Sequence, residues 1–418
     1  MKQRLFTKNF TLLVLGQISS LFGNYILHLA LSMYVLEATG SAAVFAGILS
    51  VATVPTILLS PLGGILADRA DRRKIMVALD ALTGLSVLCT AVLLSGENAI
   101  AAITVLLVVL SVLGAFETPV VQACIPQMLE GDHIIKGNAV VNQAASISYL
   151  TAPLLGGILY AVIGLKPVMY ASVVCFFLTA FFECFIKLGY QPGTDQGSVL
   201  SMVKNDFFSS IRFLAEERPD IMKMLFLTAL SRFFVMGVTL VGLPFIVRTV
   251  LGLDAKYYGG AESALAVATI LGSIAAGLLT GKLKSGRLSF VLAAIGICIV
   301  PSGAVFLFSS GAVFRYVVNV AAFCSMQAAV SIFSIFAVSM IQQNTPDHLI
   351  GKVMAYTAAI TMCAQPVGQM AYGFLFDRFR ETVGPVLIVS GILVCLIGLF
   401  SAGFFRRVDE IRSSAGED

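Results

Sequence analysis

The hydropathy of this chain alternates, with apolar stretches of membrane-spanning length separated by short polar joints. Hydrophobic residues make up 58% of the sequence and charged residues only 12%. Lipid offers no hydrogen-bond partners to an open backbone, so spanning segments are helices or a closed barrel, and these stretches are too long for barrel strands. We therefore predict an all-α membrane protein whose twelve transmembrane helices cover residues 12–36, 43–67, 75–95, 100–124, 142–164, 167–188, 223–247, 258–281, 288–309, 313–338, 353–376 and 384–405.

Basic residues concentrate on one side of the predicted membrane. The N-terminus and every second joint together carry 20 Lys and Arg, whereas the opposite joints carry 6. Cytoplasmic joints hold an excess of Lys and Arg, so we expect a multi-pass protein of the cell (inner) membrane with both termini in the cytoplasm. The same asymmetry explains the net charge of +4 without a nucleic-acid partner. Eight cysteines without a close pair predict neither a disulfide framework nor a metal site.

The second half of the chain repeats the first at an offset of 213 residues. The polar joint at Gly64–Lys74 corresponds to Gly277–Lys284 in the second half, and Pro153 corresponds to Pro366. Such a repeat is typical of transporters whose halves rock about a midplane site. We predict two pseudosymmetric six-helix bundles, 1–188 and 222–418, with the latter ending in a short cytoplasmic tail, joined by a cytoplasmic linker with an amphipathic segment, 189–221.

The joint after the second predicted helix contains a spaced motif of one glycine, one aspartate and a basic cluster: Gly64, Asp68, Arg72, Arg73 and Lys74. It resembles the loop motif of the major facilitator superfamily, which implies a conformational latch that favours one access state. Asp71 departs from the usual glycine and Gly281 replaces the aspartate in the second copy, so the latch is expected only in the first half. The alternative is that the basic cluster only orients the helices.

The fifth predicted helix carries Pro153, Gly156 and Gly157 in a pattern similar to the antiporter motif of the same superfamily. Proline and paired glycines bend a helix and permit close packing, and packing alone is the alternative reading. Val109–Val112 occupies the stretch where related exporters carry a buried arginine linked to proton coupling. Over nearly its full length the chain looks most like the macrolide-efflux and siderophore-exporter branch, which implies export.

Polar residues within the predicted spans are the candidates for substrate binding or coupling, because each is costly in lipid unless it faces the interior or a wet cavity. These candidates are Asn24, His28, Glu117, Arg232, Asn319, Gln327, Gln365 and Gln369. Glu117 is the lead proton-coupling residue, with contact to interfacial water as its alternative. A pair between Glu117 and Arg232 across the halves is a conjecture. Asn24 and His28 share a helical face and bind a polar ligand or carry a proton, or else pack against a neighbouring helix. The remaining amides serve otherwise as hydrogen bonds between helices.

Four further acids are assigned no role in transport. Asp80 is expected to pair with Arg72 or Arg73. Three glutamates close to predicted helix ends are expected to be solvated: Glu37, Glu183 and Glu262.

Missing motifs narrow the function. The sequence has no GxxxxGK[ST] loop and no segment large enough for a nucleotide domain, so a primary pump is excluded. A membrane enzyme or a channel remains the alternative class, although no catalytic cluster or ring of repeated charge is evident. We predict a monomeric secondary transporter without a cofactor, exporting amphipathic small molecules by alternating access in exchange for protons, with sodium as the alternative ion. Macrolide-like drugs are the first expected substrate, and siderophores or lipids the second.

Overall fold

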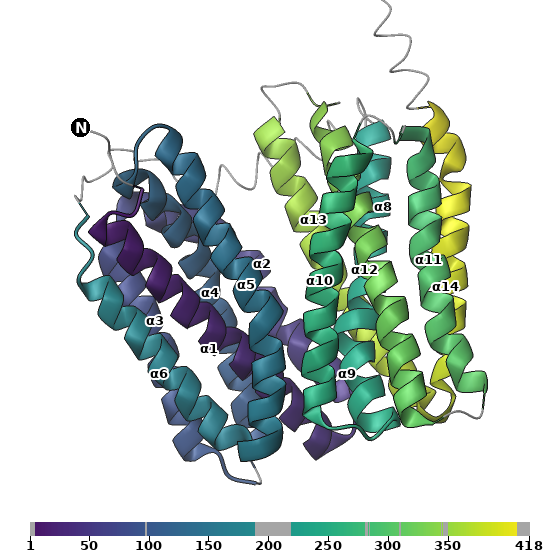
Figure 1. Ribbon diagram of the computed structural model, residues 1–418, viewed down its shortest axis with the longest axis horizontal. Helices are drawn as coiled ribbons and strands as arrows, with labels where there is room; N and C mark the ends of the chain where they lie inside the picture. The colour runs from purple at the N-terminus through teal and green to yellow at the C-terminus, as the bar shows by residue number, and fades with distance from the viewer. Residues whose placement is uncertain are drawn as a thin grey trace, which may run out of the picture. The chain divides into compact units, whose positions relative to one another are not determined.

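The computed structural model describes residues 5–96, 98–188, 219–280, 283, 285–308, 311–343, 345 and 350–407. Every regular element in these ranges is helical (Figure 1). The first six helices are α1 (Lys8–Thr39), α2 (Ala42–Arg69), α3 (Arg72–Leu93), α4 (Ala99–Met128), α5 (Asp132–Ile163) and α6 (Leu165–Cys184). The later ones are α8 (Pro219–Met236), α9 (Leu243–Phe245), α10 (Ala255–Leu279), α11 (Leu288–Ala304), α12 (Ala312–Gln343), α13 (Ile350–Arg378) and α14 (Val383–Phe400).

The predicted helices are present, with two informative differences in their limits. Eleven helical segments in the described ranges are long and apolar enough to span a membrane, and α13 covers the remaining predicted span. The fifth helix begins at Asp132, ten residues before the predicted start, because polar turns extend it beyond its apolar part. The seventh span continues from α8 through two π-helical stretches, Gly237–Gly242 and Ile246–Val250. Hydropathy thus located the spans but not their polar or irregular turns.

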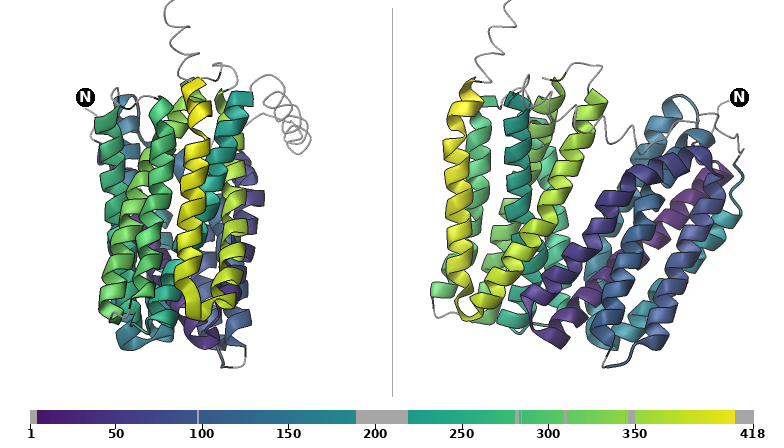
Figure 2. Two further views of the ribbon diagram at one scale, coloured as in Figure 1. Left: turned by 90° about the vertical axis from the view of Figure 1, so that its right-hand side faces the viewer. Right: turned by 180° about the vertical axis from the view of Figure 1, so that it is seen from behind.

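The helices form two compact units. Of the described residues, those within 5–40, 47–188 and 253–263 form the first, and those within 41–46, 219–252 and 264–407 form the second. Helices α2 and α10 therefore each contribute their first turns to one unit and the rest of their length to the other. Figure 2 shows the helices of each unit running alongside one another. The linker 189–221 lies almost entirely outside the described residues, as does its amphipathic segment.

Hydrogen bonds between helices fix α6 against α1 in the first unit. Asn9 and Lys187 bond reciprocally, since the Asn9 amide nitrogen donates to the Lys187 carbonyl at 2.7 Å and its oxygen accepts from the Lys187 backbone at 3.2 Å. Farther along, Ser19 donates to the Cys175 carbonyl at 2.9 Å and Thr179 to the Gly16 carbonyl at 3.0 Å. In lipid, such bonds and close packing take over the role that hydrophobic burial has in water. They place the start of α1 beside the end of α6.

Glycines let α11 and α14 touch backbone to backbone in the second unit. A Cβ atom on Gly296 would lie 2.3 Å from the Gly391 carbonyl oxygen, and one on Gly303 would lie 2.4 Å from the Gly384 oxygen. Only a residue without a Cβ permits this approach. This pair leaves α8, α10, α12 and α13 to form the cavity of the unit described below.

The first turn of α2 is held by a side chain from α13. Asp377 accepts hydrogen bonds from the Ser41 hydroxyl at 2.5 Å and from the backbone nitrogens of Ala42 at 2.6 Å and Ala43 at 3.0 Å. The first N–H groups of a helix have no partner within it, and a carboxylate there satisfies them and complements the helix dipole. Residues 41–46 belong to the same compact unit as α13.

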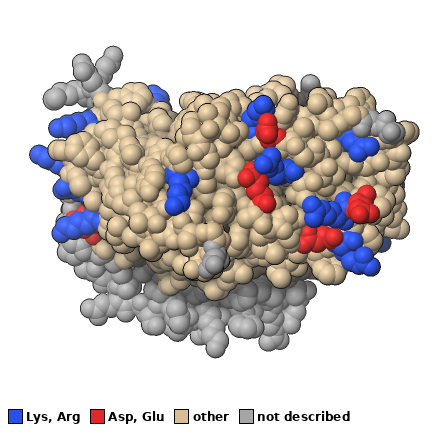
Figure 3. Space-filling model, turned by 90° about the horizontal axis from the view of Figure 1, so that it is seen from below, with Lys and Arg blue, Asp and Glu red and all other residues tan. Residues whose placement is uncertain are grey.

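The surface agrees with a membrane protein. On the face seen from below, Lys, Arg, Asp and Glu form small separate groups among uncharged residues (Figure 3). Large apolar side chains are exposed along the helices, including Leu58, Val162, Leu278 and Phe400. Exposed apolar surface on this scale is stable only where lipid or protein covers it.

Candidate functional site

Four helices of the first unit bring polar side chains together inside the bundle. Ser20 comes from α1, Asp80 from α3, Glu117 from α4 and Glu183 from α6. Asp80 is 2% exposed, Glu183 is 1% exposed and Glu117 is half-buried. Acidic residues within spanning helices are costly and mark ion or proton pathways. We refer to Asp80, Glu117 and Glu183 as the carboxyl cluster.

Ser20 lies between two members of the carboxyl cluster, Asp80 and Glu117. Its hydroxyl lies 3.0 Å from Asp80 Oδ1 and 3.4 Å from Glu117 Oε1, so it donates to one or the other. Glu183 lies close enough to Asp80 for the two carboxyl groups to interact. Two carboxylates that share a buried site repel each other when both are ionised. The arrangement therefore favours a proton on one of the two.

The nearby basic residues do not neutralise this cluster. Arg72 donates to the Ala123 carbonyl oxygen at 2.8 Å, and Arg73 donates to the Cys184 carbonyl oxygen at 2.5 Å. The side chains that interact with the Asp80 carboxyl group are those of Ser20, Glu117 and Glu183. The prediction that Asp80 pairs with Arg72 or Arg73 is thus wrong, because these arginines bond helix-end carbonyls instead. Two buried oxygens, Asp80 Oδ2 and Glu183 Oε2, have no donor in the described part of the chain.

The glutamates expected to be solvated behave differently from one another. Glu37 is exposed and accepts from the Tyr160 hydroxyl at 2.8 Å. Glu183 is buried, which contradicts the prediction, because α1 and α3 cover the end of α6. Glu262 is half-buried and bonds to the Tyr258 hydroxyl one turn away. Distance from a helix end therefore did not decide whether these acids meet water.

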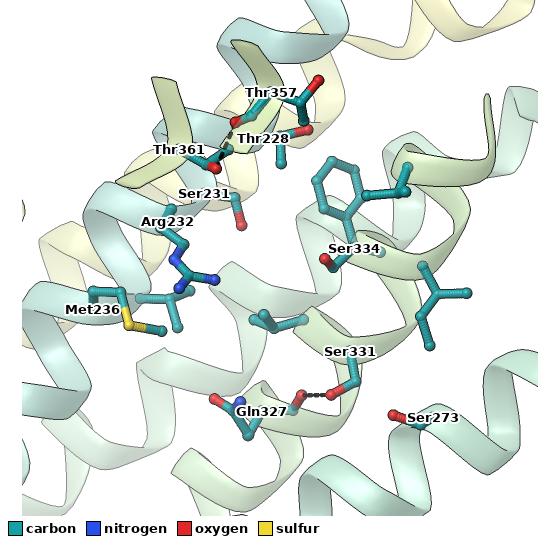
Figure 4. Close-up of a pocket in the computed structure, with 15 residues that line it drawn as sticks. Thr228, Ser231, Arg232, Met236, Ser273, Gln327, Ser331, Ser334, Thr357 and Thr361 are labelled. Carbon is teal, nitrogen blue, oxygen red and sulfur yellow. Dashed lines mark hydrogen bonds between the residues drawn. The ribbon is translucent and has the colours of Figure 1, made fainter. Parts of the chain in front are cut away.

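The second unit contains a cavity of about 300 Å³ between α8, α10, α12 and α13 (Figure 4). Two of the residues singled out from the sequence, Arg232 and Gln327, line it. Its other polar lining consists of hydroxyl groups, and the rest is apolar: Thr228, Ser231, Ser273, Ser331, Ser334, Thr357 and Thr361, with Val235, Met236, Val330, Phe333, Ile335 and Val338. An apolar cavity with few polar groups is the usual form of a small-molecule site.

The Arg232 guanidinium points into this cavity from α8, toward the side of Ser334 and Gln327 (Figure 4). Arg232 itself is exposed to the open space. Among the described residues that line the cavity it is the only ionisable one. The cavity therefore offers one fixed positive charge within an otherwise uncharged wall.

The remaining polar candidates lie outside the cavity lining. Asn24 and His28 are half-buried, one turn apart on α1. Asn319 is 1% exposed and its amide nitrogen donates to the Arg315 carbonyl at 2.8 Å, within its own helix. Gln365 and Gln369 lie one turn apart on α13, with Gln369 buried. Glu117 and Arg232 belong to different units, so the conjectured pair between them stays a conjecture.

The two sequence motifs occupy helix ends and helix contacts. Gly64 and Asp68 lie in the last turns of α2, with side chains outside the described residues. Asp71 caps α3, accepting from the Lys74 backbone at 3.4 Å, and the Lys74 ammonium lies 3.8 Å from the same carboxylate. The latch therefore stays a prediction.

In the helix-five motif, a Cβ on Gly156 would lie 3.1 Å from Ile26 Cα of α1. A Cβ on Gly157 would lie 2.7 Å from the Ala255 oxygen at the start of α10. Pro153 is buried beside Gly259 of α10. Close packing, the alternative given above, describes these contacts, and a role as a pivot stays a prediction.

Sequence reasoning passed over Asp80, Glu183 and most cavity hydroxyls. A usable signal was present for the hydroxyls, since Ser and Thr recur three or four residues apart on otherwise apolar helices, as at 228 and 231, 331 and 334, and 357 and 361. No comparable signal united the acids, because each stands alone on its own helix.

Comparisons with known proteins agree with this architecture. The family model described as Major Facilitator Superfamily matches residues 13–368. Macrolide efflux protein A of Streptococcus pyogenes is 25% identical over 399 residues, covering 92% of this chain and 93% of the relative. Multidrug efflux pump Tap of Mycolicibacterium fortuitum is 22% identical over 397 residues, covering 90% and 92%. The crystal structure of a D-xylose-proton symporter shares the fold, with a TM-score of 0.70 at 14% identity over 94% of this chain and 96% of that one.

Proposed function

Because the chain belongs to the major facilitator superfamily and is a membrane transporter rather than an enzyme, we propose that it exports amphipathic small molecules in exchange for protons. Relatives named for macrolide and multidrug efflux support export across the cell membrane. Macrolide-like compounds are the first substrate to test, and their export would confer drug resistance. Siderophores and lipids are the second.

The observation that carries proton exchange is the grouping of Asp80, Glu183 and Glu117 inside the bundle. Carboxylates that share a buried site repel each other, which favours a proton on one of them, and no basic side chain in the described residues bonds to the cluster. Glu117 is the most accessible of the three, being half-buried, and shares the Ser20 hydroxyl with Asp80. We assign proton entry and release to Glu117, and proton retention to Asp80 and Glu183.

Exchange follows if cargo and proton favour different access states. When the cluster is protonated, the negative charge among its carboxyl groups is reduced, and the Ser20 hydroxyl bonds Asp80 or Glu117. When a proton leaves, negative charge remains among α1, α3, α4 and α6, and these helices gain by rearranging to let water or a cation approach. A ligand shifts such an equilibrium only by its differential affinity for the two states. Alternating access coupled in this way needs one chain, so we propose a monomer, with both termini in the cytoplasm.

The experiment uses inverted membrane vesicles from efflux-deficient bacteria that express the chain. Accumulation of a labelled macrolide is driven by an imposed proton gradient, and in parallel by a sodium gradient alone. We expect uptake with the proton gradient, collapse of that uptake with a protonophore, and a loss of about 10-fold or more in Glu117→Gln. Glu37→Gln is the matched control because Glu37 is an exposed glutamate outside the cluster.

Two outcomes would contradict the proposal. Proton-driven uptake that is unchanged in Glu117→Gln would remove Glu117 from coupling. Uptake driven equally well by sodium alone would replace the proton as the exchanged ion.

A further inference from the structure

The cavity of the second unit has an uneven charge. Of the fifteen residues that line it, Arg232 carries the only ionisable side chain, and no carboxyl group lies among the described lining residues. A carrier for purely cationic compounds would place acids rather than a base in its wall, because like charges repel strongly in a weakly screened space. The wall of this cavity instead carries a base and no acid among its described lining residues.

Arg232 has unused binding capacity. In the residues that the structure describes, no hydrogen bond or ion pair engages its guanidinium, which points into the open cavity (Figure 4). A guanidinium presents five N–H donors in a planar fork that matches a carboxylate or phosphate. Because Arg232 is exposed to the cavity, an anionic group that enters can form charge-assisted hydrogen bonds with the guanidinium directly.

The hydroxyl groups around Arg232 can accept hydrogen bonds from donors on the same ligand. Thr228 donates to the Met224 carbonyl at 2.9 Å, and Ser331 donates to the Gln327 carbonyl at 3.0 Å. With its hydrogen used inside the helix, each hydroxyl keeps oxygen lone pairs for a donor in the cavity. Met236 and Phe333 supply apolar wall. Together these groups suit a molecule with an apolar body, an anionic group and nearby N–H or O–H donors.

We propose that the cavity binds its cargo through an anionic group on Arg232, so that the transported class is acidic or zwitterionic amphiphiles. The inference rests on the proposed function in taking this cavity as part of the transport route. It moves simple cationic amphiphiles, and macrolides that carry only a basic amine, behind compounds with a carboxylate or phosphate.

Three fluorescent probes of one scaffold test this assignment by equilibrium binding to the purified protein in detergent. They are N-dansyl-leucine, which is an anion, its neutral primary amide, and its cationic 2-aminoethyl amide. We expect the anion to bind wild type about 10- to 100-fold more tightly than the amide, and the cation to bind most weakly. Arg232→Gln should lose the preference for the anion, and Arg232→Lys should retain part of it. Arg380→Gln removes an exposed arginine outside the cavity and should behave as wild type.

The wild-type comparison stands even if a variant folds poorly, because it uses one protein and three ligands. Equal binding of the three probes, binding of none, or an anion preference that persists in folded Arg232→Gln would overturn the assignment. No proton gradient is involved, and Glu117→Gln should keep the anion preference. A failure here thus leaves proton-coupled export standing, and a failure of coupling leaves this binding preference standing.

Discussion

The carboxyl cluster of the first unit and the cavity of the second unit use polar groups in opposite ways. The first packs three acids and Ser20 against one another, with Asp80 and Glu183 almost fully buried. The second spreads one base and several hydroxyls around open space. Each lies within one of the two compact units. In our proposals one unit carries the ion site and the other the cargo site, which a repeated scaffold permits because the chemistry depends on a few side chains rather than on the helices.

The largest effect should come from disrupting the helix packing beside the cavity of the second unit. Gly368 of α13 faces α8 so closely that a Cβ would lie 2.2 Å from the Phe233 carbonyl oxygen, next to Arg232. Gly368→Leu should therefore separate the two helices and cost about 3 kcal/mol or more, or prevent folding. Thermal unfolding of the purified protein measures this. Gly47→Ala is the control, because nothing lies within 4 Å of a Cβ there, and its stability should not fall. A stable Gly368→Leu protein would contradict the packing of α13 on α8.

The next effect distinguishes charge from bonding in the carboxyl cluster. Glu183→Gln keeps the size of the side chain and gives Asp80 an amide donor, so the bundle should keep its stability to within about 1 kcal/mol. In our proposal the same change removes a group that retains a proton, so proton-driven uptake should fall about 10-fold. Glu183→Leu leaves Asp80 buried without this partner and should lose stability as well, by about 1–3 kcal/mol. Equal transport by Glu183→Gln and wild type would limit Glu183 to a structural role.

A smaller effect is expected outside both regions. Asp377→Ala removes three hydrogen bonds from the first turn of α2 and should lower the free energy of unfolding by about 1–2 kcal/mol. Binding of the charged probes should be unchanged, since Asp377 does not line the cavity. A loss of anion preference in this variant would show that the cavity is not independent of the α2 cap.

The smallest effect is expected for a substitution of Lys74, an exposed residue of the loop motif. The Lys74 ammonium lies 3.8 Å from Asp71, and the Lys74 side chain is 84% exposed. Exposed pairs contribute little, so Lys74→Gln should change stability by less than about 0.5 kcal/mol. A larger loss in thermal unfolding would indicate that this pair does more than cap α3.

Much of the fold could be predicted from the sequence, because hydropathy reports directly which segments lie in lipid. The twelve spans and the helical class follow from it. The early start of α5 at Asp132 could not be predicted in this way, since its first turns are polar. The π-helical turns after Met236 have no hydropathy signal at all.

The sites were less predictable, because they depend on which helices meet. Glu117, Arg232 and Gln327 could be selected as polar residues within apolar spans. Glu183 was expected to be solvated because it lies close to the end of its predicted helix, yet neighbouring helices bury it. Counting residues from a helix end gives depth along one helix, but not what covers the side chain.

The most direct test of the central claim is the number of protons released when cargo binds. Purified protein in weakly buffered detergent solution is mixed with a saturating transported substrate, and a pH indicator reports the release. We predict proton release by wild type, less release by Glu117→Gln and Asp80→Asn, and wild-type release by Glu37→Gln. Release that is unchanged in both cluster variants would contradict the assignment of the exchanged proton to the carboxyl cluster.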